Sequence, residues 1–130
     1  MNVLVIGSGG REHAIVEAIS RSPKAPKIYA APGNAGIAQL AECVAIKDTE
    51  VDKLLEFAKA NAIDLTVVGP EAALAAGVVD TFRAEGLNIF GPTKAAAEIE
   101  ASKDFAKRLM KKYDVPTADY ATFSDFEEAM

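Results

Sequence analysis

The stretch from Val3 to Ala14, VLVIGSGGREHA, constrains the fold more than any other part of the chain. It opens with Val3–Ile6, an unbroken apolar run of the kind found in strands buried on both faces of a parallel sheet. A glycine-rich turn, Gly7–Gly10, follows, and Arg11–Val16 then has the character of a helix start. Strand, glycine turn and helix in this order bring free N–H groups and the positive end of the helix dipole together. The stretch therefore predicts an anion site that suits a phosphate-bearing ligand.

The same alternation of strand and helix continues as far as Gly91. Further strands are expected at residues 27–31, 43–46, 65–68 and 88–90. Helices are expected at residues 12–20, 38–40, 49–61, with Thr49 as a candidate cap, and 74–85, which Gly86 ends. Strands that alternate with helices of about ten residues pair in parallel through right-handed crossovers. We therefore predict an α/β fold, a doubly wound, mostly parallel five-stranded sheet with helices on both faces.

Beyond Gly91 the sequence becomes charged and mainly helical. We expect a C-terminal helical extension over Thr93–Tyr113, with a break near Ala101-Ser102. A strand is expected at Tyr120–Phe123, and Ser124–Glu128 has the pattern of a capping box that opens another helix. Because the chain stops inside that helix, we expect it to be a truncated part of a longer protein.

Composition argues against several classes of function. The formal net charge of −5 comes from acidic residues spread along the chain, so we expect no nucleic-acid-binding face. The one cysteine, Cys43, excludes an internal disulfide, and its apolar neighbours predict a small core residue. The one histidine, His13, lacks a cluster of other ligands, so we expect no metal site and place His13 beside the glycine turn. We see neither a membrane-spanning apolar run nor a signal peptide, and therefore expect a cytoplasmic protein.

Four of the five expected strands end in loops that contain glycine. These loops are residues 7–10, 32–36, 69–71 and 91–93. In an open parallel sheet they lie along one edge, where ligands bind, so they favour a binding cleft over glycines that serve turn geometry alone. Glu71 closes the third loop. Its carboxylate is suited to the vicinal diol of a ribose or to an amine, or it is a first-turn glutamate that the helix dipole favours.

The first loop invites comparison with a dinucleotide site. The fingerprint Gly-x-Gly-x-x-Gly is matched at Gly7 and Gly9 but has Glu12 in its third place. The end of the second strand, Ala30–Pro32, lacks the acidic residue that binds the adenosine ribose. Both differences weaken the case for NAD, and Glu12 is either a ligand contact or a favourable acid in the first helical turn. A monophosphate is compatible with the loop, and the groups that would hold it belong to Ser8, Gly9, Gly10 and Arg11.

Several segments in order resemble the phosphoribosylamine–glycine ligase family, also called glycinamide ribonucleotide synthetase, which is similar to the wider ATP-grasp ligases. The segments are VLVIGSGGREHA, APGNAG, DLTVVGPEAALAAGVVD, IFGPTKAAAEIEASKDFAK and VPTADYATF. They cover essentially the whole chain, and their combination is specific where any one alone would not be. The resemblance implies that residues 1–100 form an N-terminal sugar-phosphate-binding domain. It implies that residues 101–130 are a linker and the truncated start of an ATP-grasp domain.

The activity that this resemblance implies is an ATP-dependent ligation in purine biosynthesis. ATP phosphorylates the carboxylate of glycine, with Mg²⁺ at the phosphates, and the amine of 5-phosphoribosylamine then attacks to give glycinamide ribonucleotide. The implied substrate-binding residues are Ser8, Gly9, Gly10, Arg11, Glu12, Gly33, Asn34 and Glu71. Lys103 is implied to reach an ATP phosphate, and no catalytic or metal-binding residue is assigned. Glycine, the metal and most of ATP are bound by later domains of the family, so we expect this chain alone to be inactive.

Alternatives to this interpretation stay open at the level of the sequence. One is an NAD-dependent oxidoreductase domain, and another is a non-catalytic module of the same fold that binds a phosphate ligand. An aminoimidazole ribonucleotide carboxylase or a biotin carboxylase is the nearest alternative among ATP-grasp enzymes. Ala73 stands where the resembled family usually has proline, which predicts a less rigid loop around Glu71. We expect a small-molecule substrate, no nucleic-acid or membrane partner, and a monomer.

Overall fold

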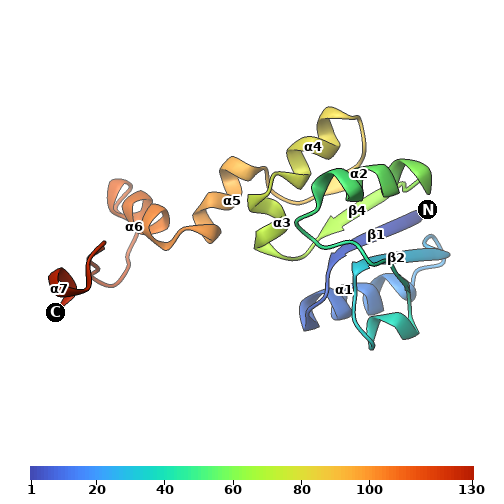
Figure 1. Cartoon of the computed structure of the whole chain (residues 1–130), viewed down its shortest axis with the longest axis horizontal. Coiled ribbons are helices and arrows are strands. Elements are labelled where there is room, and N and C mark those ends of the chain that lie inside the picture. The colour runs from blue at the N-terminus through green and yellow to red at the C-terminus, as the bar shows by residue number, and fades with distance from the viewer. The chain divides into compact units, whose positions relative to one another are not determined.

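A computed structural model describes all residues from 1 to 130. The chain forms two compact units, residues 1–97 and residues 98–130. The first unit is built on a five-stranded sheet of order β3-β2-β1-β4-β5, in which every pair of neighbouring strands is parallel (Figure 1). The strands are β1 (Asn2–Gly7), β2 (Lys27–Pro32), β3 (Glu42–Cys43), β4 (Leu65–Val68) and β5 (Ile89–Phe90). The predicted α/β fold is confirmed, with a sheet that is parallel throughout.

Strand β1 lies at the centre of the sheet. Val3 pairs with Ile28 of β2 on one side and with Leu65 of β4 on the other. The residues Val3–Ile6 are at most 1% exposed, because helices cover both faces of the sheet here. The chain runs outward from β1 to β2 and β3, and then places β4 on the opposite side of β1. The switch in strand order therefore falls between β1 and β4, where open sheets of this kind bind ligands.

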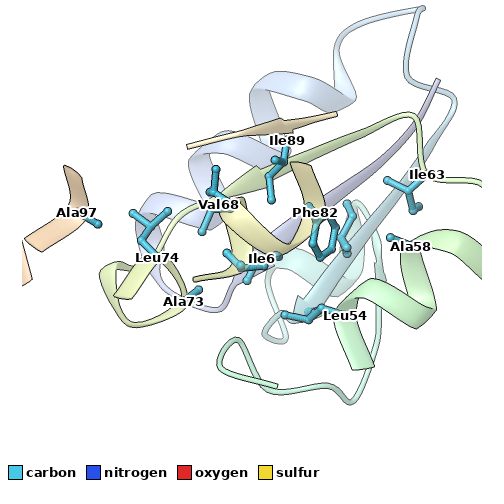
Figure 2. Packing of buried hydrophobic residues seen from close by; sticks show 14 residues of the cluster. Ile6, Leu54, Ala58, Ile63, Val68, Ala73, Leu74, Phe82, Ile89 and Ala97 are labelled. Carbon is cyan, nitrogen blue, oxygen red and sulfur yellow. The ribbon is translucent and has the colours of Figure 1, made fainter. Parts of the chain in front are cut away.

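Helices cover both faces of this sheet, as predicted. The helices of one face are α1 (Gly10–Ser20) and the short 3-10 helix η1 (Ile37–Gln39). Those of the other face are α2 (Val51–Ala60), α3 (Glu71–Ala75) and α4 (Val78–Ala84). Val16 and Ile37 are buried on the first face. On the second, Leu54 and Phe82 pack in one cluster with Ile6 (Figure 2). Alternate residues of β1 thus serve two separate cores, because successive side chains point to opposite faces.

The helix expected at residues 74–85 is two helices in the structure. Gly77 separates α3 from α4 with a φ of +87°, in the left-handed region that favours glycine. The prediction failed here because the apolar spacing continues across the break. Leu74 before it and Val78 after it are both buried in the same cluster. The expected stop is confirmed, since α4 ends just before Gly86.

Two expectations around β3 are wrong. The strand is Glu42–Cys43 and does not extend to residue 46, although Val44 still donates from its N–H to the carbonyl of Ala30 at 2.8 Å. Cys43 is exposed and is no core residue, because this short strand lies at the edge of the sheet. The cap of α2 is also different, since Glu50 rather than Thr49 precedes Val51.

The second unit is helical. Helix α5 (Lys94–Ala101) runs into it and is followed by α6 (Lys103–Lys112) and α7 (Phe126–Ala129). The predicted break is confirmed at Ser102, whose hydroxyl accepts a hydrogen bond from the N–H of Phe105 at 3.2 Å. The strand expected at Tyr120–Phe123 does not form, and Asp125 rather than Ser124 caps α7. No helix of the chain combines the length and the apolar character needed to cross a bilayer.

Candidate functional site

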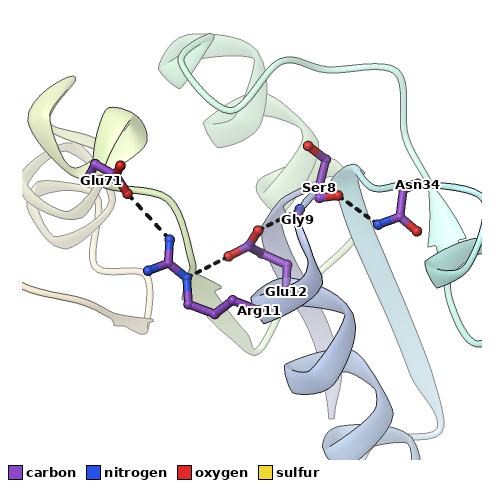
Figure 3. A network of polar contacts seen from close by, with 6 residues as sticks. All are labelled: Ser8, Gly9, Arg11, Glu12, Asn34 and Glu71. Atoms are coloured by element: carbon purple, nitrogen blue, oxygen red, sulfur yellow. Dashed lines mark hydrogen bonds and ion pairs between the residues drawn. The ribbon is translucent and has the colours of Figure 1, made fainter.

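Three loops meet at the edge formed by the carboxyl ends of the strands (Figure 3). The N–H of Gly33, after β2, donates to the carbonyl of Gly7 at 3.1 Å, and the N–H of Gly69, after β4, donates to the carbonyl of Ile6 at 3.1 Å. The predicted gathering of these loops at one edge is therefore confirmed. Gly91, in the fourth loop, serves packing, because a Cβ there would crowd the side chains of Val79 and Leu74.

The first loop, residues 7–10, leads directly into α1. The first hydrogen bond of this helix runs from the N–H of His13 to the carbonyl of Gly9 at 3.0 Å. The N–H groups of Gly10, Arg11 and Glu12 therefore precede the helical hydrogen-bond ladder and have no acceptor in it. They lie at the positive end of the helix dipole, and the residues Ser8–Arg11 are all exposed. This part of the loop is open to an anion.

Glu12, by contrast, points inward. Its side chain is 5% exposed, and its Oε2 accepts a hydrogen bond from the N–H of Gly9 at 2.7 Å. A Cβ on Gly7, Gly9 or Gly69 would collide with the Glu12 side chain, so these glycines leave the space that the carboxylate fills. The Gly9 amide consequently has an acceptor within the protein, whereas the amides of the exposed residues Gly10 and Arg11 stay available to an anion.

Arg11 connects the loop after β1 with the loop after β4. Its Nε donates to Oε1 of Glu12 at 3.0 Å, and its Nη2 lies 3.4 Å from Oε2 of Glu71. The hydrogen bond to Glu12, more than the one to Glu71, raises the pKa of Arg11. The pKa of Glu71 is lowered, first by a hydrogen bond from its own backbone N–H and then by Arg11. Both groups are therefore charged at neutral pH, and Glu71 lies on the same edge as the anion-accepting loop.

Asn34 joins the second loop to the first. Its Nδ2 donates to the carbonyl of Ser8 at 2.7 Å, and its Oδ1 accepts from the N–H of Ile37 at 2.9 Å. Gly33 lies beside Cys43, whose Sγ is 3.7 Å from the carbonyl oxygen of Asn34. The position of Cys43 at the border of this site was not predictable from its neighbours in sequence, because the contact depends on how β3 ends beside β2.

His13 and Ala73 support the site from outside it. His13, which we expected beside the first glycine turn, packs against the second loop, because a Cβ on Gly36 would meet its ring. Ala73 is fully buried inside α3, and Glu71 is the first residue of that helix. Glu71 is thus held by helical structure and not by the loop that the sequence predicted.

Lys103 belongs to the second unit, where it is exposed at the start of α6, and its contact with ATP stays a prediction. The chain also has no group of three or more histidine, cysteine, aspartate or glutamate side chains that could hold a metal ion.

Residues 1–100 match the family model described as phosphoribosylglycinamide synthetase, N domain. The chain belongs to this family. Among its curated relatives, the phosphoribosylamine–glycine ligase of Caldanaerobacter subterraneus is 58% identical over 130 residues, which are all of this chain and 31% of the relative. The ligase of Pasteurella multocida is 55% identical, again over all of this chain and 31% of the relative. The chain therefore spans about a third of the length of these relatives.

Solved structures agree with this membership. The crystal structure of phosphoribosylamine–glycine ligase from Thermotoga maritima matches 92% of this chain and 26% of its own, with a TM-score of 0.64 and 34% identity. The N5-carboxyaminoimidazole ribonucleotide synthetase of the same organism matches 98% of this chain and 35% of its own with a TM-score of 0.68. The biotin carboxylase domain of Hydrogenobacter thermophilus 2-oxoglutarate carboxylase, solved with MgADP, matches 98% of this chain and 31% of its own with a TM-score of 0.71. At 19% and 17% identity the last two share the fold alone.

Proposed function

We propose that this chain binds 5-phosphoribosylamine as the N-terminal part of a phosphoribosylamine–glycine ligase. The observation that carries the proposal is the contact of 3.4 Å between Arg11 and Glu71, which sets a carboxylate beside an open helix N-terminus. Family membership over residues 1–100 supports the choice of ligand. Of the substrate-binding residues proposed from the sequence, we retain as ligand contacts Ser8, Gly10, Arg11, Gly33, Asn34 and Glu71. The other two, Gly9 and Glu12, bond to each other, and we propose them as supporting residues of the site.

The two ends of the ligand match different groups of the site. A sugar phosphate presents a dianion, which the amides of Gly10 and Arg11 and the helix dipole favour. Its ribose presents a vicinal diol, and the ionised carboxylate of Glu71 accepts hydrogen bonds from two such hydroxyls. We therefore propose a phosphate subsite at the amides of Gly10 and Arg11 and a ribose subsite at the carboxylate of Glu71.

We place the full reaction in the whole protein. It would join glycine to 5-phosphoribosylamine at the expense of ATP, giving glycinamide ribonucleotide, and this chain would hold the amine substrate. ATP with Mg²⁺ would activate the glycine carboxylate by phosphorylation. We propose Lys103 as a contact to an ATP phosphate, and residues 101–130 as the start of the ATP-binding domain. Since this chain offers no metal-binding cluster, Mg²⁺ would be held by other residues. We further propose a cytoplasmic protein that is active as a monomer.

An NAD-dependent oxidoreductase is less well supported. Dinucleotide sites bring the backbone at the second glycine of the fingerprint close to a pyrophosphate. In this chain that glycine is Gly9, and its N–H is bonded to Glu12. The residues at the end of β2, Ala30–Pro32, also supply no carboxylate for an adenosine ribose.

Calorimetric titration of the chain with ribose 5-phosphate, a stable analogue without the amine, tests the proposal. We expect saturable binding, and an affinity at least about tenfold weaker in Glu71→Gln, which corresponds to about 1.4 kcal/mol. The matched control is Glu85→Gln, because Glu85 is a similarly exposed glutamate paired with Lys59 at 2.7 Å. Equal affinity in the wild type and Glu71→Gln, or tighter binding of NADH than of ribose 5-phosphate, would contradict the proposal.

A further inference from the structure

We infer that Glu12 is a positioning residue of this site. Its carboxylate occupies the N–H of Gly9, so that a ligand cannot bind there, and it orients Arg11, which holds Glu71 beside the loop of residues 7–10. This inference rests on the proposed function. It assigns to Glu12 a role other than contact with the substrate.

The carboxylate of Glu12 is buried. A buried carboxylate is costly unless charged or polar partners compensate it. Glu12 has two partners on its two oxygens, the N–H of Gly9 at 2.7 Å and Nε of Arg11 at 3.0 Å. Gly7 and Gly69, from the ends of β1 and β4, surround the same side chain. Glu12 is therefore held between two strand ends and cannot turn outward to a ligand without leaving its partners.

Arg11 faces two carboxylates, those of Glu12 and Glu71 (Figure 3). Its contact with the buried Glu12, at 3.0 Å, is shorter than its contact with the exposed Glu71, at 3.4 Å. A guanidinium is planar and donates in fixed directions, so a bond to a fixed carboxylate at Nε also sets the direction of Nη2. The buried carboxylate of Glu12 thus fixes the orientation of Arg11. The exposed carboxylate of Glu71 remains accessible to a ribose.

The bond between Glu12 and the Gly9 amide also affects which ligands the loop can bind. With that amide occupied, the loop offers the consecutive amides of Gly10 and Arg11, which suit one phosphate group. A bridging diphosphate that needs the Gly9 backbone would have to displace the Glu12 carboxylate. The side chain in the third fingerprint position therefore favours a monophosphate over a dinucleotide.

A double-mutant cycle in the chain tests this role. The variants are Glu12→Gln, Arg11→Met and the two combined, and the measurement is the affinity for ribose 5-phosphate by calorimetry. Glutamine keeps the volume and an acceptor for Gly9 but loses the charge that holds Arg11. We expect each single variant to bind about five- to tenfold more weakly and the double variant to be no weaker than Arg11→Met, because coupled residues are non-additive. Losses that multiply in the double variant, or unchanged affinity in Glu12→Gln, would overturn the inference.

Two further measurements keep the test decisive. Arg11→Lys, at an exposed position, retains the charge but cannot contact both carboxylates through one rigid plane, so we expect it to bind as weakly as Arg11→Met. Wild-type affinity in Arg11→Lys would refute the bridging role even if Glu12→Gln failed to fold. Carboxyl NMR of Glu71 needs no ligand. Removal of the Glu12 charge alone would lower the pKa of Glu71, so a resonance that titrates at higher pH in Glu12→Gln, which we expect, reports that Arg11 has left Glu71. An unchanged titration of Glu71 in Glu12→Gln would contradict the inference. A wild type that does not bind ribose 5-phosphate would instead contradict the proposed function.

Discussion

At the scale of single residues, the charge of Glu71 decides how the site responds to pH. Its pKa is lowered by its own backbone N–H and by Arg11. A carboxyl group whose pKa is lower in the folded state contributes stability above its unfolded pKa, and this contribution is lost as the pH falls through the folded value. We predict that the stability difference between the wild type and Glu71→Gln disappears only at pH values below the ordinary range of a glutamate.

Denaturant titrations of both proteins between neutral and strongly acidic pH measure this difference. In Arg11→Met we expect the stability contribution of Glu71 to be lost at a higher pH than in the wild type. The pKa of Glu71 should still stay below the ordinary value of a glutamate, because the hydrogen bond from its backbone N–H remains. A stability difference that falls away above the ordinary pKa of glutamate would contradict the structure.

The glycines around Glu12 give a second prediction at this scale. Gly69→Ala would place a Cβ on the Glu12 side chain and should cost about 1–3 kcal/mol of unfolding free energy, as overpacking does. The matched control is Gly10→Ala, where a Cβ meets nothing within 4 Å. That variant should keep the stability of the wild type or gain up to about 1 kcal/mol, because alanine favours helix over glycine. Equal losses in the two variants, measured by chemical denaturation, would show that the space around Glu12 is not filled as described.

At the scale of elements, the break between α3 and α4 depends on Gly77. Its φ of +87° costs an alanine about 1–2 kcal/mol, while the position itself has room, since a Cβ would lie 3.7 Å from Lys94. We predict that Gly77→Ala lowers the unfolding free energy by about this amount and that Gly77→Asn loses less, because asparagine tolerates the left-handed region. Thermal denaturation that ranks asparagine below alanine would argue for a continuous helix.

The elements also show what a sequence can and cannot predict here. The apolar run Val3–Ile6 and the turn after it identified the central strand and the anion-accepting helix start, because both signals are local. The burial of Glu12 was not predictable, since its space is left by Gly7 at the end of β1 and Gly69 after β4, and these strands are neighbours only after folding. The break at Gly77 was missed because the apolar period runs through it, and glycine alone is an ambiguous signal.

At the scale of the whole molecule, the chain is expected to bind without ligating. It spans 31% of the ligases of C. subterraneus and P. multocida. We predict no glycinamide ribonucleotide when the chain is incubated with ATP, Mg²⁺, glycine and phosphoribosylamine, as followed by mass spectrometry. The control is a full-length ligase from either relative under the same conditions. Product formation by the chain alone would show that its residues complete the reaction without another domain.

We propose that one edge of the sheet binds both a phosphate, at the amides of Gly10 and Arg11, and the sugar attached to it, at Glu71. Backbone NMR of the isotopically labelled chain, titrated with ribose 5-phosphate and separately with inorganic phosphate, tests it most directly. We predict that inorganic phosphate shifts the amides of Gly10 and Arg11, and that ribose 5-phosphate shifts these two together with Glu71. Shifts confined to another surface, such as the polar hollow lined by Glu50, Lys53 and Thr81, would contradict the claim.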